Sequence, residues 1–149
     1  MPRVDFYRLT RDPAEKVLPA LATRILANGD RLLVVAAPAM QRQAIDVALW
    51  SHQPSSFLPH GHAASADEEI EPILIAGTLD PSPPNRATYL ALADGEWRDG
   101  ALGFERIFLL FDNSRIDDAR ALWRTLAARE DVDNRFWKQD ENGRWSEGP

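Results

Sequence analysis

The sequence predicts one α/β domain spanning residues 1–149, a three-layer α/β/α sandwich around a mostly parallel or mixed central sheet. Three observations support this prediction. The chain length of 149 residues suits a single domain with its own core. Short apolar runs typical of strands alternate with segments of helical periodicity. One run, residues 31–37 (RLLVVAA), is apolar almost throughout, as in a central strand covered on both faces.

The first strand and the first helix precede that central strand. Residues 4–9 mix β-branched and aromatic side chains, as strands do. Residues 12–15 (DPAE) place Asp, Pro and Glu at the N-cap, N1 and N3 positions of a helix. Apolar residues then recur at helical spacing until Asn28-Gly29, a good C-terminal stop. Pro19 should kink this helix or mark its true start, because it cannot donate to the helical ladder.

The middle of the chain continues the alternation. Residues 41–49 have helical periodicity, and residues 73–76, 87–92 and 106–111 are typical of strands. Residues 80–85 (DPSPPN) form a turn that no regular element can cross. Parallel strands in this order require right-handed crossovers.

A last helix and a short tail complete the domain. Asn113 or Ser114 can cap a helix that runs from residue 116 to about residue 130. A turn at Asn142-Gly143 then predicts that residues 133–149 form a strand or a small hairpin.

Composition excludes several classes of function. The chain has no cysteine, which rules out disulfides and thiolate metal sites and favours a reducing, cytoplasmic location. No signal-peptide pattern and no membrane-spanning apolar run is present. The net charge of -6 makes general DNA or RNA binding improbable, because the protein repels phosphate at long range.

Catalytic motifs are weak or missing. Neither strand-to-helix junction, LTRDPAEK or AAPAMQRQ, contains the glycines that a bound phosphate needs, and no Walker lysine motif or G-x-S-x-G elbow occurs. Ser55, Ser56 and His60 share one loop, but a catalytic triad needs rigid elements. We therefore predict no enzymatic activity and no cofactor. The alternative is an enzyme that binds a nucleotide or another small ligand at the carboxyl ends of the strands.

A metal site is the second alternative. His60 and His62 carry imidazoles, and carboxylates follow in the same segment. Such groups suit zinc or manganese. These carboxylates belong to Asp67, Glu68, Glu69 and Glu71. The spacing matches no familiar ligand pattern, so a flexible acidic loop is the simpler interpretation and we predict no metal.

Binding chemistry is better supported on the last predicted helix. Arg120 and Arg124 lie one turn apart, and Trp123 lies beside them. Guanidinium groups bind carboxylates, and the indole adds an apolar wall, which together suit an acidic peptide with a hydrophobic end. The simpler interpretation is a solvated face on which Asp117 pairs with Arg120 while the indole packs on the sheet.

Two aromatic residues lie in or beside a loop punctuated by prolines. Trp50 and Phe57 fall within the segment LWSHQPSSFLPHGHA, which fits neither a helix nor a strand. As core residues they would cover a sheet edge. As exposed residues they are the kind of aromatic anchor that dominates protein interfaces.

Taken in order, eight segments resemble the chi subunit of bacterial DNA polymerase III. Leu-Trp followed by Phe-Leu-Pro-His is the most specific motif among them, and Phe136 stands where the family usually has tyrosine. The segments are DFYRLTRDP, LPALATRILANGDRLLVVAA, ALWSHQPSSFLPHG, EPILIAG, PPNRATYLAL, FERIFLLFD, DARALWRTL and FWKQDENGRW. The similarity covers nearly the whole chain.

The resemblance implies a Rossmann-like, non-catalytic clamp-loader subunit that is a monomer or part of a heterodimer and reaches DNA only indirectly. In this family, the acidic, phenylalanine-ended tail of single-stranded DNA-binding protein lies between the late strand and the last helix. The positions that match this site here are Phe111, Arg120, Trp123 and Arg124.

A second face of the family receives the psi subunit or a competing helicase. The resemblance places Trp50 and Phe57 on that face. Residues 130–133 (EDVD) depart from the family, which usually has a small turn there. We expect these acids to lie near the tail site and to oppose an acidic ligand.

Overall fold

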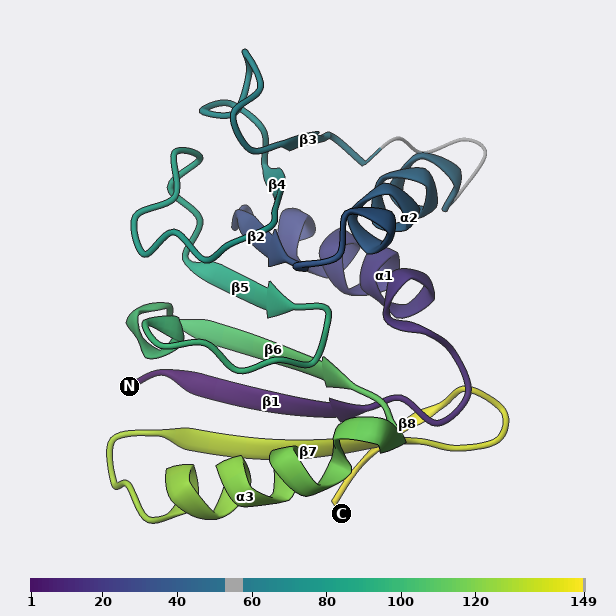
Figure 1. Cartoon of the computed structure of the whole chain (residues 1–149), viewed down its shortest axis with the longest axis vertical. Coiled ribbons are helices and arrows are strands. Elements are labelled where there is room, and N and C mark those ends of the chain that lie inside the picture. Colours follow the sequence, from purple (N-terminus) through teal and green to yellow (C-terminus); the bar gives the residue numbers. More distant parts are fainter. Residues whose placement is uncertain (53–57, 149) are drawn as a thin grey trace.

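The computed structural model describes residues 1–52 and 58–148, and within them the chain forms one eight-stranded sheet. The strand order is β3-β4-β2-β5-β6-β1-β7-β8 (Figure 1). The strands are β1 (Arg3–Arg8), β2 (Leu32–Val35), β3 (His60–His62), β4 (Ile73–Ala76), β5 (Tyr89–Leu92), β6 (Arg106–Phe111), β7 (Asp133–Gln139) and β8 (Trp145–Glu147). The helices are α1 (Ala14–Ala27), α2 (Ala39–Ser51), α3 (Ile116–Ala127), and the 3-10 turns η1 (Ala101–Gly103) and η2 (Asn113–Arg115).

The sheet is parallel except at one edge. Every pairing from β3 across to β7 is parallel, and β8 alone runs antiparallel, against β7. Parallel strands need long crossovers, and α1, α2 and α3 lie within these connections. The predicted α/β sandwich with a mostly parallel or mixed sheet is therefore confirmed.

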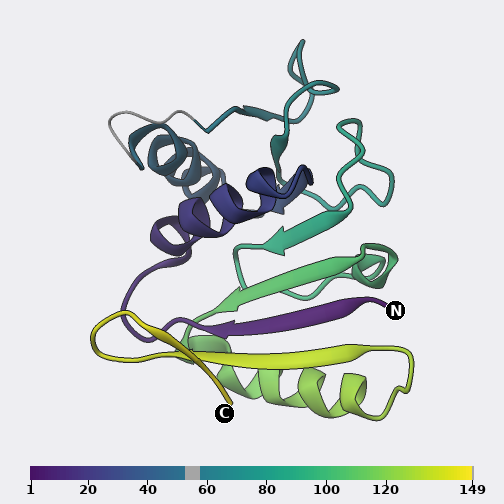
Figure 2. The same ribbon diagram turned by 180° about the vertical axis from the view of Figure 1, so that it is seen from behind.

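Helices lie on both faces of the sheet. One face packs on α1 and α2, and Leu18 and Ile45 join its core (Figure 2). The other face packs on α3 and on the segment around η1, with Phe6 and Leu126 in its core (Figure 1). Side chains alternate along the strands, so adjacent residues of β2 enter opposite cores. This double coverage explains why residues 31–37 are so apolar.

The start of α1 differs from the prediction by one residue. Pro13 is the N-cap, and it makes no side-chain capping bond. The carboxylate of Asp12 instead accepts a hydrogen bond of 2.9 Å from the side chain of Gln139, so the predicted cap at Asp12 was wrong. Pro19 lies inside α1, which continues through it, and the hydroxyl of Thr23 donates to its carbonyl at 2.8 Å.

Other boundaries shift because tertiary contacts decide them. The last helix ends at Ala127, before the predicted end at residue 130. β5 starts at Tyr89, two residues later than predicted. β3 occupies residues 60–62, within a segment predicted to be a loop, because it pairs with β4. No helix in the described ranges is long and apolar enough to cross a membrane.

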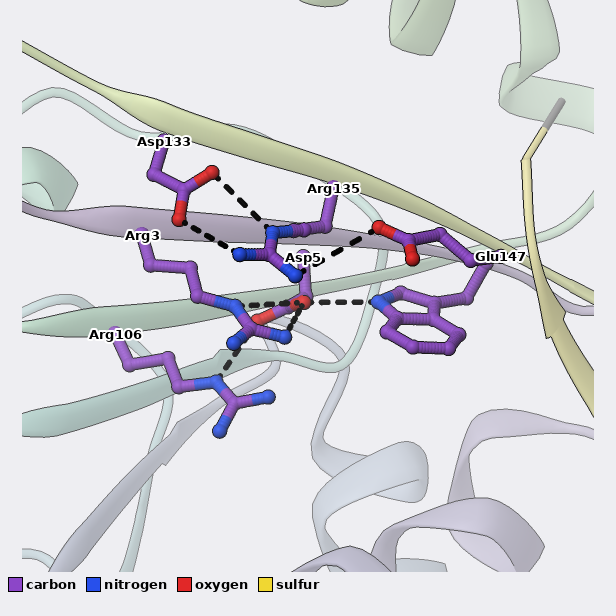
Figure 3. A network of polar contacts seen from close by, with 7 residues as sticks. Arg3, Asp5, Arg106, Asp133, Arg135 and Glu147 are labelled. Atoms are coloured by element: carbon purple, nitrogen blue, oxygen red, sulfur yellow. Dashed lines mark hydrogen bonds and ion pairs between the residues drawn. The ribbon is translucent and has the colours of Figure 1, made fainter.

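A network of polar side chains joins β1 to both of its neighbouring strands (Figure 3). Asp5 is fully buried. Its carboxylate accepts hydrogen bonds from Arg3 at 2.9 Å, from Arg106 at 2.8 Å and from the indole of Trp137 at 2.8 Å. Arg135 extends the cluster toward β8 by pairing with the carboxylates of its neighbours. The network therefore links β6, β1, β7 and β8 on the face of the sheet opposite α3.

Candidate functional site

A groove of about 180 Å³ lies between α3 and the strands β1 and β7. Side chains from all three elements line it, namely Arg8, Ile116, Arg120, Trp123, Arg124 and Phe136. Three of the four predicted tail-site residues therefore meet in one hollow. Arg8, Ile116 and Phe136 complete it and were not predicted to belong to the site.

Aromatic rings form the apolar part of the groove. The indole of Trp123 packs edge-on against Phe6, with ring centroids 5.3 Å apart, and against Phe136 at 5.9 Å. Phe6 and Phe136 stack with an interplanar angle of 12°. Trp123 is only partly buried, so one part of the indole packs on the sheet and another borders the hollow.

Phe111 lies beneath this layer and does not line the groove. It is 1% exposed and contacts Phe6 and Phe136 through T-shaped pairs at 6.5 Å and 6.0 Å. It therefore supports the floor of the groove, and Phe136 occupies the wall position that we had expected Phe111 to provide.

Arginines make the groove cationic on a chain that is acidic as a whole. Arg120 and Arg124 project from α3 and are exposed, and Arg8 projects from the end of β1. No carboxylate is among the lining residues. In the described part of the chain, Asp117 and Arg120 form no ion pair, so the simpler interpretation of a self-neutralised helix face is not observed. This site can bind a ligand that is both anionic and apolar.

The acidic residues 130–133 lie outside the lining of the groove. The carboxylate of Asp131 accepts from Arg129 at 2.8 Å, and that of Asp133 lies 3.3 Å from Arg135. The hydrogen bond from Arg129 also holds the pKa of Asp131 below its ordinary value. These ion pairs partly offset the negative charge near the end of α3.

Trp50 lies in the last turn of α2, and its side chain is exposed. It is 57% exposed and makes an edge-on contact with the ring of His60, with centroids 5.3 Å apart. Phe57, the other residue assigned to this face, lies outside the described residues. Met40 and Val47 are exposed on the same helix at helical spacing from Trp50, so α2 presents an apolar stripe to solvent.

The predicted histidine pair engages a carboxylate of α2. The Nε2 of His60 lies 2.9 Å from Asp46, and its Nδ1 lies 2.7 Å from the carbonyl of Leu58. His62 approaches the same carboxylate at 3.4 Å. Among the described residues, no group of three or more potential ligands is arranged to hold a metal. Local hydrogen bonding therefore accounts for both rings.

A second hollow of about 620 Å³ lies at the carboxyl ends of β1, β2, β5 and β6. Here β1 leads to α1 on one face of the sheet, and β6 leads to α3 on the other, which is where such sheets commonly bind ligands. Five carboxylates and two guanidinium groups line it, from Asp12, Glu15, Asp94, Glu96, Asp112, Arg11 and Arg115. This excess of negative charge opposes a phosphate ligand.

Asp94 joins the loops that border this second hollow, and its replacement tests that role. Burial opposes its ionisation, but hydrogen bonds from Arg98 and from the backbone N–H groups of Ala37 and Glu96 outweigh burial and lower its pKa. Asp94→Asn should therefore lower the free energy of unfolding by about 1–2 kcal/mol at neutral pH. Urea denaturation would measure this loss.

The same variant gives a pH dependence of known sign. Because the pKa of Asp94 is lower in the folded state, its stabilisation is present above the unfolded-state pKa and disappears as pH falls through the folded-state pKa. The stability difference between wild type and Asp94→Asn should narrow in acid. A difference that stays constant down to strongly acidic pH would contradict this assignment.

Comparison with known proteins identifies a family that matches this chain. The family model described as DNA polymerase III chi subunit, HolC, matches residues 1–141. Curated proteins give no match. Among solved structures, the C-terminal domain of the Sulfolobus solfataricus SWI2/SNF2 ATPase aligns with a TM-score of 0.45 and 10% sequence identity. That alignment covers 74% of this chain and 56% of the other, so it spans little more than half of that structure.

Proposed function

The chain belongs to the DNA polymerase III chi subunit family, and from this premise we propose that it is a non-catalytic adaptor that binds the acidic C-terminal tail of single-stranded DNA-binding protein. It would thereby link the clamp loader, in the cytoplasm, to protein-coated DNA that it does not contact itself. The observation that carries the proposal is the groove beside α3, where exposed arginines surround an aromatic floor.

Each part of the tail has a matching part of the groove. The terminal phenylalanine packs on the aromatic surface that Trp123 and Phe136 present to the groove, where apolar surface is removed from water. The terminal carboxylate and neighbouring acids meet the guanidinium groups of Arg120 and Arg124. Neither arginine has to break an ion pair with a described residue before it binds.

Calorimetric titration with a synthetic tail peptide tests the proposal. Arg120 and Arg124 are exposed, so each ion pair would lie at the rim of the interface. We expect Arg120→Ala and Arg124→Ala each to weaken binding by about 1 kcal/mol, roughly fivefold, and wild-type affinity to fall with added salt.

Arg24→Ala is the matched control, because Arg24 is also an exposed arginine on a helix but lies on α1, on the opposite face of the sheet. It should bind the peptide as wild type does. Unchanged affinity in both groove variants, or equal binding of a peptide with the same composition in scrambled order, would remove the proposed site.

The exposed stripe of α2 supports a second docking face. We propose that Trp50, together with Phe57, receives the psi subunit or a helicase. Trp50→Ala should leave the free energy of unfolding within about 1 kcal/mol of wild type, because the side chain is largely exposed. The variant should nevertheless fail to retain purified psi in a pull-down.

Ile70→Ala is the control for this face, since Ile70 is also exposed but lies outside α2. It should retain psi. A loss of several kcal/mol of stability in Trp50→Ala would instead identify a core residue and end the docking proposal.

The hollow of about 620 Å³ supports one competing function, a small-ligand enzyme. Thermal shift assays with nucleotides and with the tail peptide distinguish the two. A rise in melting temperature with nucleotide alone would favour the enzyme.

A further inference from the structure

The edges of the groove beside α3 differ in charge. This difference favours one direction in which the upstream residues of a bound tail can extend out of the groove. The first turn of α3 carries Asp117, and the segment beyond its last turn carries Glu130. Acidic tail residues that extended along α3 toward either end of the helix would therefore meet negative charge. The remaining edge of the groove is β7, which lies alongside α3 (Figure 1).

Lys138 lies on this third edge. In the parallel register of β1 and β7, Phe6 pairs with Phe136 and Arg8 pairs with Lys138. Side chains two residues apart on a strand share a face, so Lys138 projects from the same face as Phe136. Arg8 and Lys138 therefore lie on adjacent strands, whose axes are about 4.8 Å apart.

Both side chains have cationic groups available. Lys138 is exposed, and its ammonium group forms no hydrogen bond or ion pair with the described residues. Arg8 uses its Nε to donate to Asn113 at 3.1 Å, and its terminal nitrogens bond no described residue. Lys138 therefore adds a positive charge on β7 beside Arg8, which already lines the groove.

We propose that Arg8 and Lys138 form a second anion subsite, which holds the acidic residues that precede the terminal phenylalanine of the tail. The tail then leaves the groove across β7. This inference rests on the proposed function and adds to it the direction of the bound peptide and two residues that select for upstream acids.

Two peptides separate this subsite from the groove. Both end in phenylalanine with a free carboxylate, and one carries upstream acids where the other carries serines. Lys138→Gln should lower the affinity for the acidic peptide about threefold, as expected for an exposed ion pair. The double variant, Arg8→Gln with Lys138→Gln, should lower it about tenfold. Affinity for the serine peptide should stay unchanged in Lys138→Gln. The double variant also removes an arginine that lines the groove, so it should weaken binding of the serine peptide, but by less than it weakens binding of the acidic peptide. Lys16→Gln, an exposed lysine on α1, should match wild type with both peptides.

The chain contains only two lysines, Lys16 and Lys138, which permits a direct readout. Acetylation of the wild-type protein with an amine reagent, followed by mass spectrometry, would report each one separately. The acidic peptide should slow the modification of Lys138 and leave that of Lys16 unchanged. The serine peptide should protect neither.

The outcomes are distinct. Unchanged affinity of the double variant for the acidic peptide, equal weakening of both peptides, or an unprotected Lys138 would overturn the subsite and leave the groove in place. If wild type binds neither peptide, the proposed function fails and the subsite fails with it.

Discussion

Trp123→Ala should lower affinity for the tail peptide by about 2 kcal/mol or more, roughly thirtyfold, while the protein remains folded at 25 °C. Tryptophan is a frequent hot spot, because its ring buries a large area at the centre of an interface. Here the indole supplies a wall of the groove, and Phe6 and Phe136 fix its orientation. Removing it opens one side of the pocket to water. Calorimetric titration would measure the loss.

Leu122→Ala is the matched control for the stability cost of that truncation. Leu122 is the preceding residue of α3 and is also partly buried against the same core, but it borders a hollow on the opposite flank of the helix. We expect each variant to lose about 2 kcal/mol of unfolding free energy, less than a fully buried side chain loses. Only Trp123→Ala should lose affinity for the tail peptide. Equal peptide affinity in the two variants would contradict the pocket.

The fold was largely predictable because burial on both faces leaves a strong pattern in the sequence. Residues 73–76 and 106–111 are strands with the predicted limits, since each is a short apolar run. β3 was missed because residues 60–62 (HGH) have no such pattern, and only the pairing with β4 at the sheet edge makes them a strand. Asp12 was misassigned as a cap because its partner, Gln139, is distant in the sequence.

The candidate site was less predictable, because strand order decides its composition. The helix pattern alone brought Arg120, Trp123 and Arg124 together. Phe136 joins them only because β7 pairs with β1, and β1 lies between β6 and β7. The same order covers Phe111 with neighbouring rings. Hydrophobicity along the chain cannot distinguish a buried ring from one that lines a groove.

Asp5→Ala should lower the free energy of unfolding by about 3 kcal/mol, the largest stability effect that we expect from one polar residue. The carboxylate is fully buried and is the common acceptor for Arg3, Arg106 and Trp137 (Figure 3). Its removal leaves two guanidinium groups facing each other and an indole N–H without an acceptor. Both arginine side chains are about 30% exposed and can turn toward water, so the loss should not reach the upper end of the range for buried pairs.

Asp133→Ala separates this effect from ordinary surface charge. Asp133 belongs to the same network, but its side chain is 38% exposed, and Arg135 is its only ion-pair partner among the described residues, so we expect a loss below about 1 kcal/mol. Urea denaturation would compare the two variants. If both variants lost a similar amount of unfolding free energy, the contacts of Asp5 would contribute no more than a surface ion pair does. Because Phe6 and Arg8 belong to the same strand as Asp5, a large loss would mean that this network also holds β1 in place beneath the groove.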